Sequence, residues 1–158
     1  MKFLTDGMLG KLTRWLRILG QDVKYSVNFN DAELIALAKK EHRVLLTRDF
    51  ELYQRSAAKQ LNAFYVEAKN ETERLAELSR RFAFPLQFDV TTSRCPKCNG
   101  KLRSIPKEKA VGKVEKNTFE NYDEFWRCTH CGKIYWRGAH WGRISAMLEE
   151  AEGKLKLS

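Results

Sequence analysis

Short runs of apolar residues alternate with longer amphipathic segments through about the first 85 positions of the chain. The apolar runs are rich in strand-forming side chains. The segments between them repeat apolar residues at intervals of three and four, as one face of a helix does. The stretch GMLGKLTRWLRILGQ shows the helical repeat most clearly, with Gly20 at its end. We expect strands at residues 2–5, 23–25, 43–47 and 62–68, and helices at 8–19, from 31, at 50–60 and at 71–82.

This alternation of strands and helices predicts the fold class. Parallel neighbours in a sheet need a crossover connection, so alternating strands and helices favour a parallel sheet with helices packed on it. We therefore expect an α/β fold with three layers and a central parallel sheet. Right-handed crossovers place the carboxyl ends of all the strands at one edge, which is where such folds bind ligands.

The composition changes near residues 85–94, which read as a connector. Residues 95–140 are aromatic, basic and cysteine-bearing, with few helical signals, and residues 141–152 show a final helical repeat. The sequence therefore predicts two parts. An α/β domain occupies residues 1–90, and a small cysteine module with a C-terminal helix occupies residues 91–158.

Charge distinguishes the two parts. The chain has 158 residues and a formal net charge of +9. Residues 1–90 hold 15 Lys/Arg against 12 Asp/Glu, whereas residues 91–158 hold 14 against 8. A positive excess of this size favours anionic partners, with nucleic acid first among them, although a merely solvated basic surface is an open alternative.

The sequence offers no sign of export or membrane insertion. The N-terminus has no long apolar core followed by a small-residue cleavage site, and no apolar run approaches the roughly 18 residues that a membrane span needs. We therefore expect no membrane partner and a reducing, cytoplasmic location.

Four cysteines form two C-x2-C motifs, CPKC and CTHC, separated by 29 residues. A gap of two residues lets both thiolates of a turn reach one tetrahedral ion, and four thiolates make a closed structural zinc site. Two paired motifs fit a metal better than a redox dithiol, which is the rival interpretation. We expect Cys95, Cys98, Cys128 and Cys131 to hold zinc, and His130 to take no part.

The loops behind the cysteines also carry information. Gly100 and Gly132 follow the two motifs and allow a tight backbone there. The spacer is longer than is common between such motifs, which predicts an inserted hairpin around residues 106–117. The surrounding sequence is typical of a zinc ribbon.

Acidic residues follow two of the predicted strands and open a predicted helix. Asp6 comes after the first strand, Asp49 after the strand at 43–47, and Asp31 lies at the start of the second helix. In a parallel sheet Asp6 and Asp49 share one edge, with Asp31 close by. Carboxylates at about 4 Å repel by about 4 kcal/mol at an effective dielectric near 20, and Mg²⁺ or Mn²⁺ would offset that repulsion.

A simpler explanation exists for each acidic residue. Aspartate is a favoured N-cap, and all three positions precede helices or open them. Arg48, Lys11 or Arg14 could neutralise the carboxylates in salt bridges. Two threonines, Thr5 and Thr47, either orient ligands or simply end their strands.

The stretches FLTDGMLGKLTRWLRILGQDV, NDAELIALAKKEHRVLLTRD and IYWRGAHW, together with the double C-x2-C, resemble a known family. It is the PIN-like ribonuclease family named after the C-terminal domain of the Mut-seven exonuclease. The resemblance covers nearly the whole chain, and it implies a PIN-like α/β domain followed by a zinc ribbon. It also implies metal-dependent cleavage of RNA. The family commonly has Gly-Ser-His where this chain has Gly-Ala-His at 138–140.

The resemblance also assigns roles to individual residues. Asp6, Asp31 and Asp49 match the acidic positions that hold the catalytic metal. The family often carries a fourth acidic position, for which Glu67 is a candidate here. The basic positions of the same motifs, where a phosphate contact is expected, are matched by Lys11, Arg14 and Arg48.

The sequence therefore leaves two main functions open. The first is a Mg²⁺- or Mn²⁺-dependent ribonuclease whose zinc ribbon helps to bind RNA. The second is a non-catalytic RNA-binding or adaptor protein with a silent acidic edge. A phosphoaspartate receiver fits less well, because it usually has an acidic pair after the first strand and Gly7 follows Asp6 here. Four aromatic residues either stack on bases or pack the ribbon: Trp126, Tyr135, Trp136 and Trp141.

Overall fold

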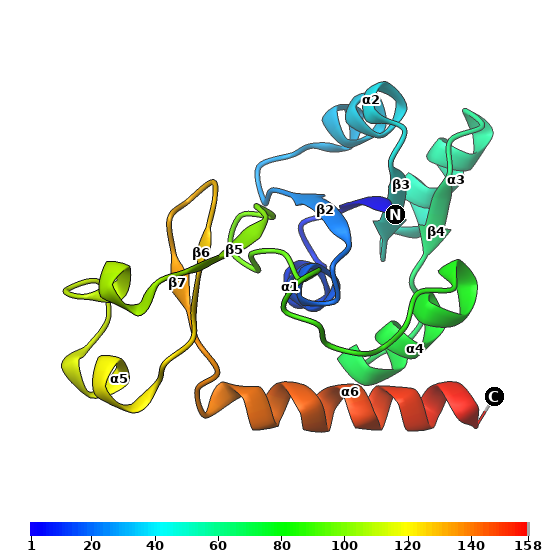
Figure 1. Ribbon diagram of the computed structural model, residues 1–158. Coiled ribbons are helices and arrows are strands. Elements are labelled where there is room, and N and C mark those ends of the chain that lie inside the picture. The colour runs from blue at the N-terminus through cyan, green and yellow to red at the C-terminus, as the bar shows by residue number, and fades with distance from the viewer. Residues whose placement is uncertain (158) are drawn as a thin grey trace.

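The computed structural model describes residues 1–157, and its first half alternates strands and helices as expected (Figure 1). The order is β1 (Lys2–Thr5), α1 (Gly10–Ile18), β2 (Asp22–Tyr25), α2 (Asp31–Glu41), β3 (Val44–Thr47), α3 (Phe50–Ala58), β4 (Ala63–Tyr65) and α4 (Glu71–Phe82). The four strands form one parallel sheet in the order β2-β1-β3-β4. The predicted α/β class with a central parallel sheet is confirmed.

Helices cover both faces of this sheet, because successive residues of each strand point to opposite sides. Phe3 and Leu46 face one core, which α1 and α4 close with residues such as Leu12 and Leu75. Their strand neighbours face a second core, which α2 and α3 close. The members of that core are Leu4, Leu34, Ile35, Ala38, Leu45 and Leu52. These two cores make the three expected layers.

The second part of the chain contains a three-stranded antiparallel sheet in the order β5-β6-β7. Its strands are β5 (Leu102–Ile105), β6 (Phe125–Cys128) and β7 (Ile134–Tyr135). The predicted inserted hairpin is wrong. The spacer instead forms a 3₁₀ helix, η1 (Lys107–Ala110), and a short helix, α5 (Lys116–Asn121), because burying Ala110 and packing Phe119 on the small ribbon core favours these turns.

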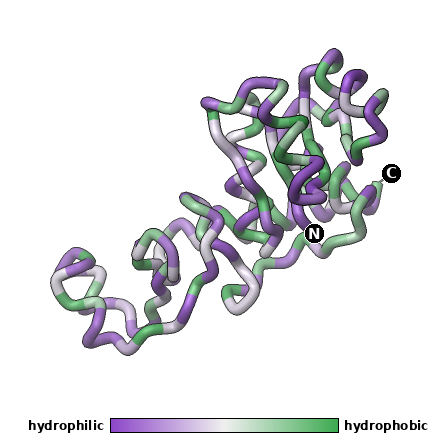
Figure 2. Tube along the Cα trace, turned by 90° about the horizontal axis from the view of Figure 1, so that it is seen from above, coloured by the Kyte–Doolittle hydropathy of each residue, from purple (hydrophilic) through white to green (hydrophobic). Residues whose placement is uncertain are grey.

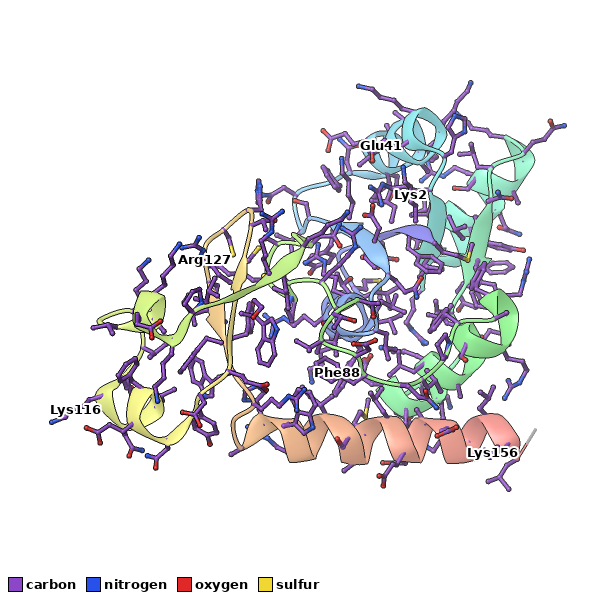
Figure 3. The ribbon with its side chains drawn as sticks, viewed as in Figure 1. Lys2, Glu41, Phe88, Lys116, Arg127 and Lys156 are labelled. Carbon is purple, nitrogen blue, oxygen red and sulfur yellow. The ribbon has the colours of Figure 1, made fainter. Side chains whose placement is uncertain are left out.

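The last helix, α6 (His140–Lys156), leaves the ribbon and returns to the α/β body, where it runs beside α4 (Figure 1). Leu148 and Ala151 of α6 join the same core as Phe3. Phe88 of the connector stacks edge-on against Trp141 at 4.4 Å between ring centroids and lies between the body and α6 (Figure 3). The C-terminal helix thus packs on the body, while the sheet and loops of the ribbon project away from it (Figure 2).

Two side chains dock the ribbon on the body. The buried guanidinium of Arg17 on α1 donates to the carbonyl oxygen of Val23 and, at 3.0 Å, to that of Pro96 in the first cysteine turn. Asn99, in the same turn, accepts from the N–H of Val23 at 3.0 Å and donates to the Asp22 carboxylate at 2.8 Å. The first cysteine turn is therefore hydrogen-bonded directly to α1 and β2.

None of the helices within residues 1–157 is both long enough and apolar enough to span a membrane.

Candidate functional site

The ends of β1 and β3 meet at one edge of the sheet, where side-chain and backbone hydrogen bonds join them. Asp6 is buried, and its Oδ2 accepts hydrogen bonds from Thr47 Oγ1 and, at 3.0 Å, from the N–H of Arg48. Its Oδ1 accepts from the N–H of Met8 at 2.8 Å. The Thr47 hydroxyl also accepts from the N–H of Asp49 at 2.9 Å. Thr47 thus bonds to the side chain of one predicted acidic ligand and to the backbone of another.

Asp49 is the N-cap of α3. Its Oδ1 accepts from the N–H of Leu52 at 3.1 Å, which satisfies one of the free donors of the first helical turn. Within residues 1–157 the other oxygen, Oδ2, accepts no hydrogen bond, and the residue is half-buried. Capping therefore uses only part of this carboxylate.

Capping does not explain the other two carboxylates. The N-cap of α2 is Asn30, which forms a capping box with Glu33, and Asp31 is already the first helical residue. The N-cap of α1 is Leu9, three residues beyond Asp6. The interpretation of all three residues as helix caps holds for Asp49 alone.

Asp31 lies apart from the hydrogen bonds that join Asp6 to Thr47. Its Oδ2 pairs with the guanidinium of Arg55 on α3, and both side chains are substantially exposed, at 43% and 54%. Within residues 1–157, three or more possible ligand atoms lie within 4.8 Å of one another only at the four cysteines. The predicted three-carboxylate site, and Glu67 as a fourth ligand, stay predictions.

The three predicted RNA contacts lie in different surroundings. Lys11 and Arg14 are exposed on the first half of α1, beyond the end of β1. Arg48 instead uses Nη1 to donate to the carbonyl oxygens of residues 66, 67 and 68, at 2.6 to 3.2 Å. This side chain holds the segment after β4 against the edge of the sheet. A phosphate contact at each of the three residues stays a prediction.

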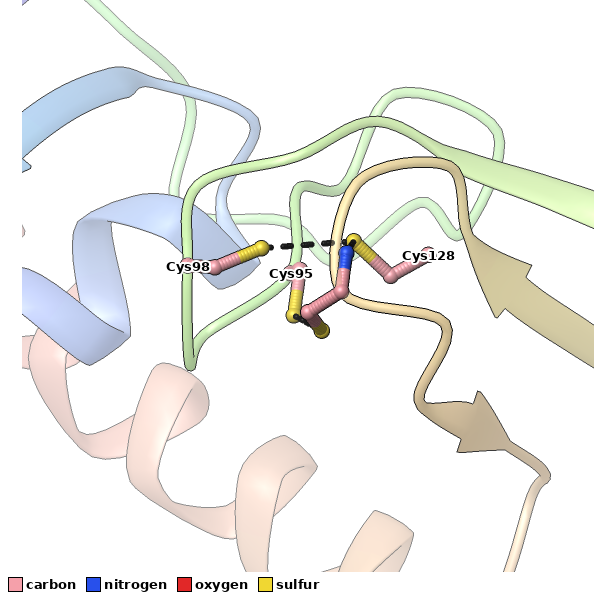
Figure 4. Close-up of side chains that lie close together, drawn as sticks. Cys95, Cys98 and Cys128 are labelled. Carbon is pink, nitrogen blue, oxygen red and sulfur yellow. Dashed lines mark hydrogen bonds between the residues drawn. The ribbon is translucent and has the colours of Figure 1, made fainter.

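The four cysteines converge between the two turns that carry them (Figure 4). The Sγ atoms of Cys95 and Cys131 are 3.8 Å apart, and those of Cys98 and Cys128 are 3.3 Å apart. A tetrahedral zinc ion with Zn–S bonds of about 2.3 Å needs sulfurs about 3.8 Å apart. The set therefore fits a Cys₄ zinc site, and all four cysteines are free thiols here, not disulfides.

The two cysteine turns have matching backbones, with one difference. Asn99 and Gly132, each one residue past the second cysteine of its turn, have positive φ of 74° and 77°. Gly100 is needed for another reason, since a Cβ there would lie 2.6 Å from the Cys128 sulfur. The prediction that Gly100 and Gly132 allow a tight backbone is right for both glycines, although in the first turn it is Asn99 that takes the left-handed conformation.

Without metal, burial and hydrogen bonding move the pKa values of two of the thiols in opposite directions. Burial opposes ionisation of Cys128, but the N–H groups of Cys131 and His130 point at its sulfur and lower its pKa to about 7. Burial raises the pKa of Cys98 to about 12. Binding of a metal by all four thiolates releases protons.

The candidate stacking residues pack mainly against the protein. Trp136 belongs to the small ribbon core with Phe125, and Trp141 packs on Phe88. The guanidinium of Arg137 lies over the rings of Trp126 and Trp141, at 5.7 and 4.8 Å from their centroids. These contacts favour the packing interpretation for the tryptophans.

Sequence reasoning missed two side chains that hold the ribbon in place. Asn99 bridges to β2, and the Tyr135 hydroxyl is hydrogen-bonded to Cys95 Sγ at 2.9 Å. The sequence does indicate a role for Asn99, because asparagine stands where the second turn has Gly132. Unlike glycine, asparagine has a side chain that can form hydrogen bonds. Tyr135 carries no comparable signal.

The fold and the two sites define the class of the protein, which is a three-layer α/β protein with carboxylates at its sheet edge and a docked four-cysteine ribbon. The family model for the Mut7-C RNAse domain matches residues 1–148, and the chain belongs to this family. The predicted family is thereby confirmed, and membership indicates a nuclease-like function. No curated protein and no solved structure matches the chain.

Proposed function

We propose that this protein is a Mg²⁺- or Mn²⁺-dependent ribonuclease with its catalytic cation at Asp6 and Asp49. The observation that carries the proposal is the Thr47 hydroxyl, which bonds to the Asp6 carboxylate and to the Asp49 backbone. It ties two acidic residues, 43 positions apart, to one edge of a parallel sheet. Membership of an RNAse domain family supports RNA as the substrate.

The two carboxylates keep lone pairs that could bind a cation. A carboxylate has about four lone-pair sites, and the hydrogen bonds to Asp6 use three of them. Asp49 spends one site on its cap to Leu52 and keeps Oδ2 open. Hard oxygen donors of this kind suit Mg²⁺ and Mn²⁺. The donor set therefore fits one such ion, with water and substrate oxygens completing the shell.

The chain's own residues orient the reacting groups. Thr47 and the N–H groups of Met8 and Arg48 fix Asp6, so that its carboxylate keeps one orientation as charge changes beside it. Lys11 and Arg14, which are exposed on the first half of α1, would attract phosphate near this edge. A bound divalent cation supplies an activated water and neutralises charge at phosphorus.

Zinc in this proposal is structural. Four thiolates fill a tetrahedral shell and leave no open position for substrate. Within residues 1–157, the ribbon core has three buried apolar residues, Ala110, Phe125 and Ile134. Such a small core needs a metal to be stable, and zinc would hold the two turns that carry the cysteines.

The test of the proposal is cleavage of labelled single-stranded RNA by zinc-loaded protein, with Mn²⁺ or with no added divalent ion. We expect cleavage only with Mn²⁺ and its loss in Asp49→Asn. Asparagine is also a good N-cap, so α3 should be unaffected and the melting temperature unchanged. Asp123→Asn, an exposed change on the ribbon, is the matched control. Cleavage that is equal in all samples, or absent from all, would contradict the proposal.

The Arg55 guanidinium tests whether Asp31 is a third ligand. It now occupies Asp31 Oδ2, and an exposed ion pair is worth about 0.2–1 kcal/mol, so Arg55→Gln should tighten Mn²⁺ binding by up to about fivefold. Bound Mn²⁺ is measured by electron paramagnetic resonance, with Lys59→Gln at the C-cap of α3 as the control. If Arg55→Gln binds Mn²⁺ no better than this control, Asp31 is not a ligand.

A non-catalytic RNA-binding protein is the second candidate, and the position of Asp31 favours it. The carboxylate that would complete a three-acid site is paired with Arg55 and lies outside any close acidic cluster within the described residues. This candidate predicts RNA binding that depends on salt and is indifferent to Asp49→Asn. The cleavage assay above separates the two.

A further inference from the structure

A basic cleft of about 720 Å³ runs between α1 and the two cysteine turns. One wall is the face of α1 that carries Lys11 and Arg14, and the facing wall brings Lys97 and Lys133 from the ribbon. Lys97 lies inside CPKC and Lys133 directly follows CTHCG, so each turn contributes one cation. All four side chains are exposed, and no carboxylate within residues 1–157 lines the cleft.

The cleft has a fixed shape because its floor is hydrogen-bonded. Arg17, whose guanidinium holds the carbonyl of Pro96, forms part of the lining and ties the two walls together. The Tyr135 hydroxyl is bonded to Cys95 Sγ, and the Lys133 ammonium lies 5.3 Å from the centre of the Tyr135 ring. The two walls therefore keep their separation as long as the ribbon is folded.

The N-terminal end of α1, which is close to Asp6 in the sequence, also lines the cleft. Gly10 lines it and is only four residues past Asp6. The Tyr25 ring closes this end, with its hydroxyl donating to the carbonyl of Gly7 at 3.2 Å. A Cβ at Gly10 would lie 2.9 Å from the Tyr25 hydroxyl oxygen, so the glycine lets the ring pack over the first turn of α1. The basic groups thus lead away from Asp6 toward the ribbon.

We propose that this cleft binds the sugar–phosphate backbone of single-stranded RNA, with Lys97 and Lys133 of the ribbon and Lys11 and Arg14 of α1 contacting successive phosphates. The inference rests on the proposed ribonuclease function for the identity of the strand. Cations spread over two walls attract a chain of phosphates. The described residues that line the cleft include no carboxylate that would repel a phosphate or bind a metal cation. Tyrosine rings beside the cations suit unpaired bases, which stack on aromatic faces. In this arrangement the cysteine turns supply half of the RNA site.

The experiment measures binding apart from cleavage. Asp49→Asn protein, zinc-loaded and without Mg²⁺ or Mn²⁺, is titrated into a short fluorescent oligouridylate while anisotropy is followed at several salt concentrations. Lys97→Gln/Lys133→Gln and Lys11→Gln/Arg14→Gln are compared with Lys39→Gln/Lys40→Gln, which removes the same charge from the exposed end of α2. The zinc content of each variant shows that the cysteine turns are intact.

Each cleft variant should lose two phosphate contacts. On a single strand each contact changes the salt slope by about 0.7, so binding should weaken by about 25-fold at about 0.1 M salt and the slope should fall by about 1.4. The α2 control should stay close to the parent. Ribbon variants that bind as tightly as the α2 control, with the parent slope, would overturn the inference, as would a parent that binds no RNA.

The result also separates this inference from the proposed function. Loss of binding in both cleft variants, in a protein that never cleaves RNA with Mn²⁺, would support the cleft and reject the nuclease. Cleavage that depends on Asp49, combined with cleft variants that bind like the control, would reject the cleft and keep the nuclease.

Discussion

Asp6→Asn is expected to abolish RNA cleavage and also to destabilise the fold. The Asp6 carboxylate accepts from three donors, two on Oδ2 and one on Oδ1. An amide has only one acceptor atom, so at least one of these donors must face an NH₂ group. The Thr47 hydroxyl can turn and accept, but a backbone N–H cannot. A buried donor left without a partner costs about 1–3 kcal/mol, which should appear in the urea unfolding curve.

The expected loss of cleavage has a different cause. A catalytic cation contributes several kcal/mol of charge stabilisation, and each 1.4 kcal/mol is tenfold in rate, so the variant should be slower by about 100-fold or more. Single-turnover cleavage with saturating Mn²⁺ measures it, at a temperature where both proteins are folded.

Asp49→Asn is the informative comparison. Its amide can keep Oδ1 toward Leu52 and present its NH₂ where Oδ2 has no hydrogen bond, so stability should be retained while cleavage is lost. A pair of variants that lose activity in proportion to their loss of stability would show that these residues are structural. Full activity in Asp6→Asn would reject the acidic site.

Cys128→Ser is expected to unfold the ribbon and leave the α/β body folded. Zinc binding is worth about 10–16 kcal/mol in small zinc-finger peptides, far more than three buried apolar residues provide. The body has two larger cores of its own, and α6 packs on one of them. Hydrogen exchange should therefore become fast over residues 95–137 and stay slow in the sheet β2-β1-β3-β4.

Loss of zinc should also speed up amide exchange at one place in the α/β body. Because Arg17 and Asn99 join the first cysteine turn to β2, amides near Val23 should exchange faster in Cys128→Ser. Asn99→Gly is the matched variant, since glycine accepts the positive φ at this position but removes both side-chain hydrogen bonds. It should keep zinc and show only the change near Val23. A ribbon that stays protected after loss of a cysteine ligand would contradict a structural metal.

Much of this fold can be predicted from local sequence. The alternation of strands and helices, the parallel sheet, the cysteine pairs and the C-terminal helix all follow from periodicity and spacing, and the structure has each of them. The hairpin predicted for the spacer at 106–117 is wrong, because the conformation depends on burial of Ala110 and on packing of Phe119 against a core that the spacing does not reveal. Asp31 pairs with Arg55 of α3, a contact that no local sequence pattern indicates, and its place in the acidic site stays a prediction.

By itself, the sequence determined which residues could form strands, helices and a four-cysteine site, since these depend on side-chain type and on short spacings. Only the tertiary structure decided which carboxylates share an edge and what they bond to. Thr47 and Asp6 are 41 residues apart in the sequence, and they meet because β1 and β3 are neighbours in the sheet. It also decided that the two cysteine turns face α1 across a basic cleft. Such contacts arise from the packing of distant elements, and no local pattern encodes them.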